Sequence, residues 1–164
     1  QIAAPSRIGL SEYTKVLDET LQAVQAVNRK FSANNWQPIL FKNDFFPLTK
    51  IIPLYKIADV CLVTSLQDGM NLVSKEFAAA NDGNGMLVLS NTAGSAEELS
   101  QAIMASPFLP ENIAEGIRQA LEMPQTEKKR RMQELKKNVF ANDVFNWSDS
   151  FVKTLMQHAR QKKT

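Results

Sequence analysis

Residues 59–77, DVCLVTSLQDGMNLVSKEF, decide the fold that we expect for this chain. Within this stretch, residues 60–63 form a short apolar run between polar neighbours, which is typical of a strand covered on both faces. The turn Gln67-Asp68-Gly69 follows, and a helix is predicted from Met70 to about Ala80. The stretch therefore predicts a strand–turn–helix unit of an α/β protein.

The turn between this strand and this helix is a candidate site for an anion. The first turn of a helix has unpaired N–H groups, and the helix dipole is positive at that end. Asp68 lies at the opening of the turn, and Glu76 follows eight positions later, about two helical turns on. The spacing alone is equally compatible with an ordinary α/β turn and a solvated glutamate, so both interpretations stay open.

Length and composition place the 164 residues in the range of one globular domain. Hydrophobic residues make up 44% of the chain, which is enough for a core, and the formal net charge of +2 gives no strong attraction to nucleic acid or to a membrane. The basic residues between 128 and 137 are interpreted as a solvated helix face. No apolar stretch reaches the length of a membrane span, and we expect a cytoplasmic protein.

Residue counts exclude several kinds of catalytic site within these residues. A single cysteine, Cys61, and a single histidine, His158, do not supply the ligands of a zinc-type site. His158 is too remote for a Ser-His-Asp arrangement, and no G-x-G-x-x-G or Walker loop is present. We therefore expect neither a metal nor a cofactor.

The rest of the chain alternates strand and helix patterns. Short apolar runs predict strands at 38–41, 86–90 and 102–104, and residues 2–4 are expected to end another strand. Apolar residues at steps of three and four predict a long helix over 10–31. Further helices are expected at 47–58, at 126–142 and at 111–123, the last of these with Ile113, Ile117 and Leu121 facing inward. A short helix is expected to start at the capping box Ser95-Ala96-Glu97-Glu98. A last helix is expected from 146, with Trp147, Phe151 and Leu155 on one apolar stripe.

Alternating strands and helices predict a doubly wound parallel sheet. Ligands in such sheets bind beyond the carboxyl ends of the strands. The loops at those ends are expected at 5–9, 42–46, 65–70, 91–95 and 105–110, and the residues of interest in them are Arg7, Phe45, Phe46, Asp68, Gly69, Asn71 and Gly94.

Several stretches together carry a family resemblance: QIAAPSR at 1–7, NNWQPILF at 34–41, IADVCLVTSLQDGMNLVSKEF at 57–77, GMLVLSNTAGSAEEL at 85–99, IAEGIRQALEMP at 113–124 and NDVFNWSDSFV at 142–152. DGMNLV followed by KEF, in combination with AGSAEEL, is highly specific. On these motifs the sequence resembles the trehalose-6-phosphate synthases, the retaining glycosyltransferases of family 20. The resemblance implies a Rossmann-like, doubly wound α/β fold, namely the C-terminal half of a GT-B type enzyme.

The resemblance also implies an activity. Members of the family transfer glucose from UDP-glucose to glucose-6-phosphate with retention, which gives α,α-trehalose 6-phosphate. Residues 1–164 would form the donor-binding domain, without its first strand and without the N-terminal domain that holds the acceptor, so we expect the isolated fragment to be inactive. The resemblance is compatible with a homo-oligomer.

Roles at individual positions follow from the resemblance in the same way. Asp68, as the catalytic carboxylate, would hold the transferred glucose, together with the backbone of Gly69, Met70 and Asn71. The N–H groups of Leu72 and Val73 would meet the pyrophosphate, and Glu76 would accept the ribose hydroxyls. Ile2 and Phe46 would enclose the uracil ring, and Arg7 would contribute from the first loop.

Two departures keep other functions open. Gln67 stands where the family commonly has an arginine, and the phosphate-binding arginine and lysine of the family would lie upstream of Gln1. The alternatives are a non-catalytic regulatory relative of the synthase and another retaining glycosyltransferase of GT-B type. Asp68 and Glu76 are both present, which favours the catalytic interpretation.

Overall fold

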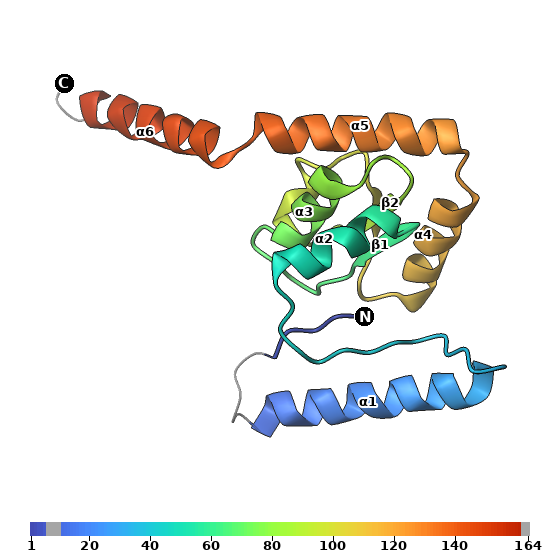
Figure 1. The fold of residues 1–164 in the computed structure, drawn as a ribbon. Helices are drawn as coiled ribbons and strands as arrows, with labels where there is room; N and C mark the ends of the chain where they lie inside the picture. The colour runs from blue at the N-terminus through green and yellow to red at the C-terminus, as the bar shows by residue number, and fades with distance from the viewer. Residues whose placement is uncertain (6–10, 162–164) are drawn as a thin grey trace. The chain divides into compact units, whose positions relative to one another are not determined.

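The computed structural model describes residues 1–5 and 11–161, and the chain divides into two compact units, Gln1–Lys50 and Ile51–Thr164 (Figure 1). The first unit contains helix α1 (Ser11–Phe31), and helix α2 (Leu48–Ile57) extends from it into the second. The elements of the second unit are β1 (Val60–Val63), α3 (Leu72–Ala80), β2 (Met86–Ser90), the 3₁₀ turn η1 (Gly94–Ala96), β3 (Ile103–Ala105), α4 (Pro110–Glu122), α5 (Gln125–Ala141) and α6 (Val144–Gln161). Within the described residues, no helix combines the length and the apolar character that crossing a membrane requires.

A three-stranded parallel sheet forms the centre of the second unit, in the order β1-β2-β3. Every residue of β2 is buried, because α3 and α4 both pack on this central strand. The predicted α/β class and parallel sheet are therefore confirmed. The prediction that residues 60–63 are covered on both faces is wrong for Leu62, which is 44% exposed on a strand at the edge of this sheet.

The strands predicted at 2–4 and 38–41 do not form. Only one parallel bridge joins Ile2 to Lys42, with the N–H of Ala3 donating to the Lys42 carbonyl at 2.8 Å. The Asn28 side chain gives the physical reason, since its amide donates to the Ile39 carbonyl at 2.9 Å and accepts from the Ile39 N–H at 3.0 Å. Both backbone groups of Ile39 are thus paired with a side chain instead of a neighbouring strand.

Two helix predictions need correction. The capping box at Ser95 yields only the 3₁₀ turn η1, because the Ser95 hydroxyl pairs with Ser74 and the Glu98 carboxylate pairs with Lys75. On α4, Leu121 is 57% exposed and does not face the core. Gly116 and Ala120 take the buried positions.

A close approach to the sheet explains the buried glycine on α4. A Cβ added at Gly116 would lie 3.0 Å from the Val88 side chain on β2. The helix therefore contacts the sheet through its small residues, which turns Leu121 toward solvent.

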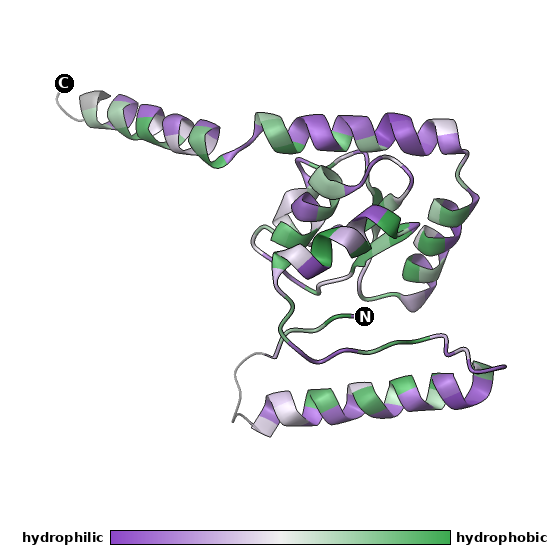
Figure 2. Ribbon diagram, in the orientation of Figure 1, coloured by the Kyte–Doolittle hydropathy of each residue, from purple (hydrophilic) through white to green (hydrophobic). Residues whose placement is uncertain are grey.

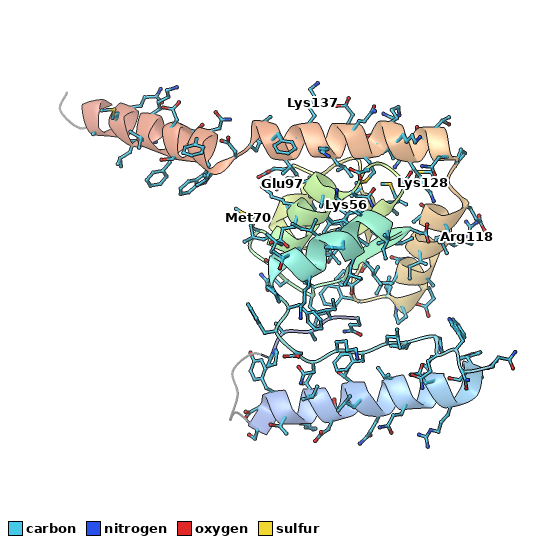
Figure 3. All side chains as sticks on the ribbon, in the orientation of Figure 1. Lys56, Met70, Glu97, Arg118, Lys128 and Lys137 are labelled. Atoms are coloured by element: carbon cyan, nitrogen blue, oxygen red, sulfur yellow. The ribbon has the colours of Figure 1, made fainter. Side chains whose placement is uncertain are left out.

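Helix α5 packs across α3 and is mostly hydrophilic (Figure 2). Lys137 points away from the body of this unit (Figure 3), and Arg130 and Arg131 both pair with Glu127. Hydrogen bonds from Arg130, and secondarily from Arg131, lower the pKa of Glu127 to about 2. The solvated face that we predict on this helix is thus confirmed for these residues, whereas Lys128 is buried.

The apolar stripe that we predict on the last helix is present on α6. Trp147 and Phe151 stack with their ring centroids 5.5 Å apart and their planes within 15°. Both rings and Leu155 are exposed.

Candidate functional site

The loops that follow β1 and β2 meet at the carboxyl edge of the sheet. A parallel bridge joins Asp68 to Ala93. The N–H of Gly94 donates to the Asp68 carbonyl at 2.9 Å, and the N–H of Ser95 donates to the Met70 carbonyl at 2.7 Å. Two of the loops predicted to bind a ligand, 65–70 and 91–95, are therefore held together by their backbones.

Gly94 permits this close contact between the two loops. A Cβ added at Gly94 would lie 2.2 Å from the Gly69 carbonyl oxygen, far inside van der Waals contact. Gly69 itself borders open space, since among the described residues no heavy atom beyond Gly69 and its chain neighbours lies within 4 Å of where its Cβ would be. One glycine thus closes the junction between the loops, and the other leaves the outer side of the turn accessible.

Helix α3 begins at Leu72, two residues later than predicted, with Asn71 as its N-cap. Asn71 has a φ of 79°, a left-handed conformation that side chains rarely adopt, and its side-chain oxygen accepts the Ser74 N–H at 2.8 Å. Within residues 1–5 and 11–161, no acceptor pairs with the N–H groups of Leu72 and Val73. Both residues are exposed, so two donors at the positive end of the helix dipole can bind an anion.

The Asp68 carboxylate holds the turn in shape. Its Oδ1 accepts the Met70 N–H at 3.1 Å, and its Oδ2 accepts the Asn71 side-chain amide at 3.0 Å. Each carboxylate oxygen has further acceptor capacity, because an ionised carboxylate offers about four lone-pair sites. Asp68 is half-buried and can accept hydrogen bonds from ligand hydroxyls while it orders the turn.

Glu76 lies one helical turn after the two free donors, three positions after Val73 and four after Leu72. It is half-buried, and its Oε2 accepts the Tyr55 hydroxyl at 3.1 Å. Burial, followed by the hydrogen bond to Glu76, raises the pKa of Tyr55 well above its usual value, so Tyr55 stays a donor. The Tyr55 bond fixes the orientation of the Glu76 carboxylate.

The other predicted site residues belong to the first unit. Phe45 is 75% exposed, and Phe46 is half-buried. Ile2 is held by its bridge to Lys42. Arg7 lies outside the described residues. The described residues contain no group of three or more side chains arranged to hold a metal ion.

A sequence model of glycosyltransferase family 20 matches residues 1–157. The chain belongs to this family. Its fold matches the α,α-trehalose 6-phosphate synthase of Burkholderia multivorans with a TM-score of 0.92 and 34% identity, over 99% of this chain and 35% of that one. The fold that we expected from the resemblance is confirmed.

Other family 20 relatives agree with this assignment. The trehalose-6-phosphate synthase of Cronobacter sakazakii is 36% identical over 96% of this chain and 34% of its own length. A structure from E. coli bound with UDP-2-fluoro glucose has a TM-score of 0.91 and 34% identity, and it covers 96% of this chain and 35% of that one. The chain thus spans about a third of the length of these relatives.

Sequence reasoning missed three residues of this candidate site. Tyr55 lies 21 positions before Glu76, on a different helix, and its role depends on the packing of α2 against α3. Ser74 and Ser95 are also 21 positions apart and form a buried pair behind the turn. The AGSAEEL motif marks the neighbourhood of Ser95, but only the fold shows which residue it contacts.

Proposed function

We propose that this chain is the donor-binding part of an enzyme that transfers glucose from UDP-glucose to glucose-6-phosphate with retention, giving α,α-trehalose 6-phosphate. One observation carries the proposal: in a family 20 chain, Leu72 and Val73 have free N–H groups at the start of α3, and they lie between Asp68 and Glu76 in the sequence. Related structures support it, one from E. coli with UDP-2-fluoro glucose and one from Burkholderia xenovorans in complex with glucose-6-phosphate.

Three different sets of protein groups hold the pyrophosphate, the ribose and the glucose of the donor. The pyrophosphate lies at the N–H groups of Leu72 and Val73, where aligned donors and the helix dipole replace its hydration. Glu76 accepts the ribose hydroxyls, and a carboxylate accepts such bonds more strongly than a neutral group does. Asp68 accepts hydroxyls of the transferred glucose, with the backbone of Gly69, Met70 and Asn71 beside it.

The same groups serve the chemical step. The bond from the anomeric carbon to the UDP oxygen breaks, and the acceptor hydroxyl forms its bond on the same face of the sugar. The departing phosphate oxygen takes the acceptor's proton. Negative charge grows on that phosphate, and the free donors at the start of α3 stabilise it because they are already oriented.

Ile2 and Phe46 enclose the uracil ring, and Arg7 contributes to donor binding. The protein acts in the cytoplasm, where its nucleotide-sugar donor is available.

An assay of UDP release, with and without glucose-6-phosphate, tests the proposed function in the full-length protein. Release that depends on glucose-6-phosphate, with trehalose 6-phosphate as product, would support it. Gln67 is exposed in the site loop and gives the regulatory alternative a specific basis. That alternative predicts UDP binding without any turnover, and a different GT-B transferase would turn over only with another acceptor.

Replacing Glu76 by alanine in the full-length protein should weaken UDP binding about 10- to 150-fold. The variant loses charge-assisted hydrogen bonds to the ribose, worth about 1.5–3 kcal/mol. Isothermal calorimetry measures this change. Glu97→Ala is the matched control, because Glu97 is an exposed glutamate of the same unit (Figure 3) and should leave the affinity within about twofold. Equal UDP affinity in wild type and Glu76→Ala would refute the ribose assignment.

Residues 1–164 produced alone should make no trehalose 6-phosphate. The chain spans about a third of the relatives, and we propose that the acceptor site lies in the remaining two thirds. Without a held acceptor, the advantage of oriented reactants is lost, which corresponds to about 7–11 kcal/mol in favourable cases. UDP release by the fragment that rises when glucose-6-phosphate is added would contradict this proposal.

A further inference from the structure

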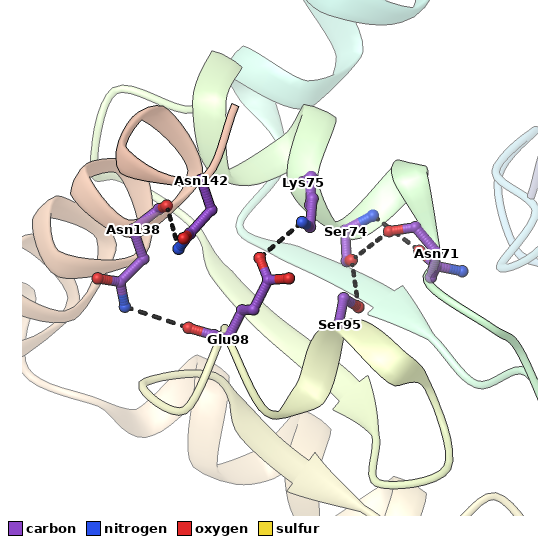
Figure 4. A network of polar contacts seen from close by, with 7 residues as sticks. All are labelled: Asn71, Ser74, Lys75, Ser95, Glu98, Asn138 and Asn142. Atoms are coloured by element: carbon purple, nitrogen blue, oxygen red, sulfur yellow. Dashed lines mark hydrogen bonds and ion pairs between the residues drawn. The ribbon is translucent and has the colours of Figure 1, made fainter. Parts of the chain in front are cut away.

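We infer that Ser95 is a positioning residue for the nucleotide-sugar site, acting through Ser74 on the N-terminus of α3. This inference rests on the proposed function and adds to it a role for η1. The two serines form a buried chain of hydroxyl groups behind the turn that holds the free donors (Figure 4).

The hydrogen bonds show which serine hydroxyl donates and which accepts. The Ser74 hydroxyl donates to the Asn71 carbonyl at 2.8 Å, and the Ser74 and Ser95 oxygens lie 2.9 Å apart. A hydroxyl has one proton, so Ser74 has none left for Ser95 and must accept the Ser95 proton. Both serines are fully buried, which leaves water unable to replace either partner.

The chain of hydroxyls ends on a residue under conformational strain. Asn71 adopts a φ of 79°, and its own side chain bonds to both Asp68 and the Ser74 N–H. A left-handed conformation in a residue other than glycine persists only when the surroundings fix it. The Ser74–Ser95 pair fixes the Asn71 carbonyl. The same planar peptide contains the Leu72 N–H, which points in the direction opposite to this carbonyl.

Ser95 is attached to this turn twice. Its hydroxyl reaches Ser74, and its backbone N–H donates to the Met70 carbonyl at 2.7 Å. The side of the loop away from the site is held separately, by the Lys75–Glu98 ion pair at 2.6 Å and by the Asn138 amide on the Glu98 carbonyl at 3.1 Å (Figure 4). Removing the Asn138 contact therefore loosens the loop without touching the Asn71 carbonyl.

The test compares the affinity of the full-length protein for UDP with its affinity for uridine. In Ser95→Ala, UDP affinity should fall about tenfold, while uridine affinity, measured by NMR titration, should stay within about twofold. Uridine lacks the pyrophosphate, so a positioning role for the helix N-terminus affects UDP alone. The double variant Ser74→Ala/Ser95→Ala should lose no more UDP affinity than Ser74→Ala does, since Ser95 acts through Ser74.

Controls separate this role from a structural one. Asn138→Ala should lower the melting temperature by about as much as Ser95→Ala does, and it should leave the UDP affinity within about twofold of wild type. Ser95→Cys, nearly isosteric with a weaker donor, should show the same split between UDP and uridine. The inference is overturned if Ser95→Ala weakens UDP and uridine equally, if it leaves UDP affinity unchanged, or if neither variant of Ser95 folds. Wild-type protein that binds no UDP would refute the proposed function itself, a result different from each of these.

Discussion

Asp68→Asn in the full-length protein should lower the rate of glucosyl transfer about 100-fold, with UDP affinity reduced less than about tenfold. The wild-type carboxylate accepts from the Met70 N–H and from the Asn71 amide, so both of its oxygens face donors. Asparagine must direct its own N–H₂ at one of those donors, which breaks that bond and removes the charge. About 3 kcal/mol of barrier corresponds to this change in rate.

The rate of UDP release with saturating donor and glucose-6-phosphate measures the effect, and UDP calorimetry measures binding. Asp59→Asn is the matched control, because Asp59 is an exposed aspartate next to β1. It should retain the wild-type rate within about twofold. If Asp68→Asn weakens UDP as strongly as it slows transfer, Asp68 does not act on the sugar separately from the nucleotide.

Gly94→Ala should lower the free energy of unfolding by about 3 kcal/mol and weaken UDP binding more than about 100-fold. The new Cβ would lie 2.2 Å from the Gly69 carbonyl oxygen and 2.8 Å from its carbon, both backbone atoms. The loops must separate, which breaks the bond from the Gly94 N–H to the Asp68 carbonyl. Asn71 and the donors of Leu72 and Val73 would move with the turn.

Denaturant unfolding and UDP calorimetry on the same preparations check this prediction. Gly69→Ala is the informative partner, because a Cβ at Gly69 would meet none of the described residues within 4 Å other than its chain neighbours. It should leave the free energy of unfolding within about 0.5 kcal/mol. A Gly94→Ala protein as stable as Gly69→Ala would show that the junction of the two loops is not tightly constrained.

The strands and most helices could be predicted because their patterns are local. Residues 60–63 and 86–90 are apolar runs of strand length, and the steps of three and four over 10–31 predict the helix that the structure describes as α1. The strand prediction at 38–41 failed on a contact that the local pattern does not contain, the Asn28 side chain. The capping box at Ser95 failed similarly, since Ser74 and Lys75 engage the two residues that would have formed it.

In the candidate site, too, local sequence patterns predict some features, whereas others depend on contacts between residues far apart in the sequence. Asp68, Gly69 and Asn71 are close in sequence, so the strand–turn–helix pattern could place them at a helix N-terminus. The orientation of Glu76 depends on Tyr55, whose carbonyl accepts from Asn81 at 2.8 Å and whose ring meets Phe77 edge-on. Such contacts arise from the packing of α2 on α3 and have no periodic signature in the sequence.

Backbone amide resonances of Leu72 and Val73 give the most direct test of the central claim, that these two N–H groups bind the pyrophosphate of the donor. The full-length protein, labelled with ¹⁵N-leucine and ¹⁵N-valine, would be titrated with UDP and, separately, with uridine. We predict large shifts of both resonances with UDP and small ones with uridine, because only UDP brings phosphate oxygens to the helix N-terminus. Saturating UDP that leaves both resonances in place would contradict the claim.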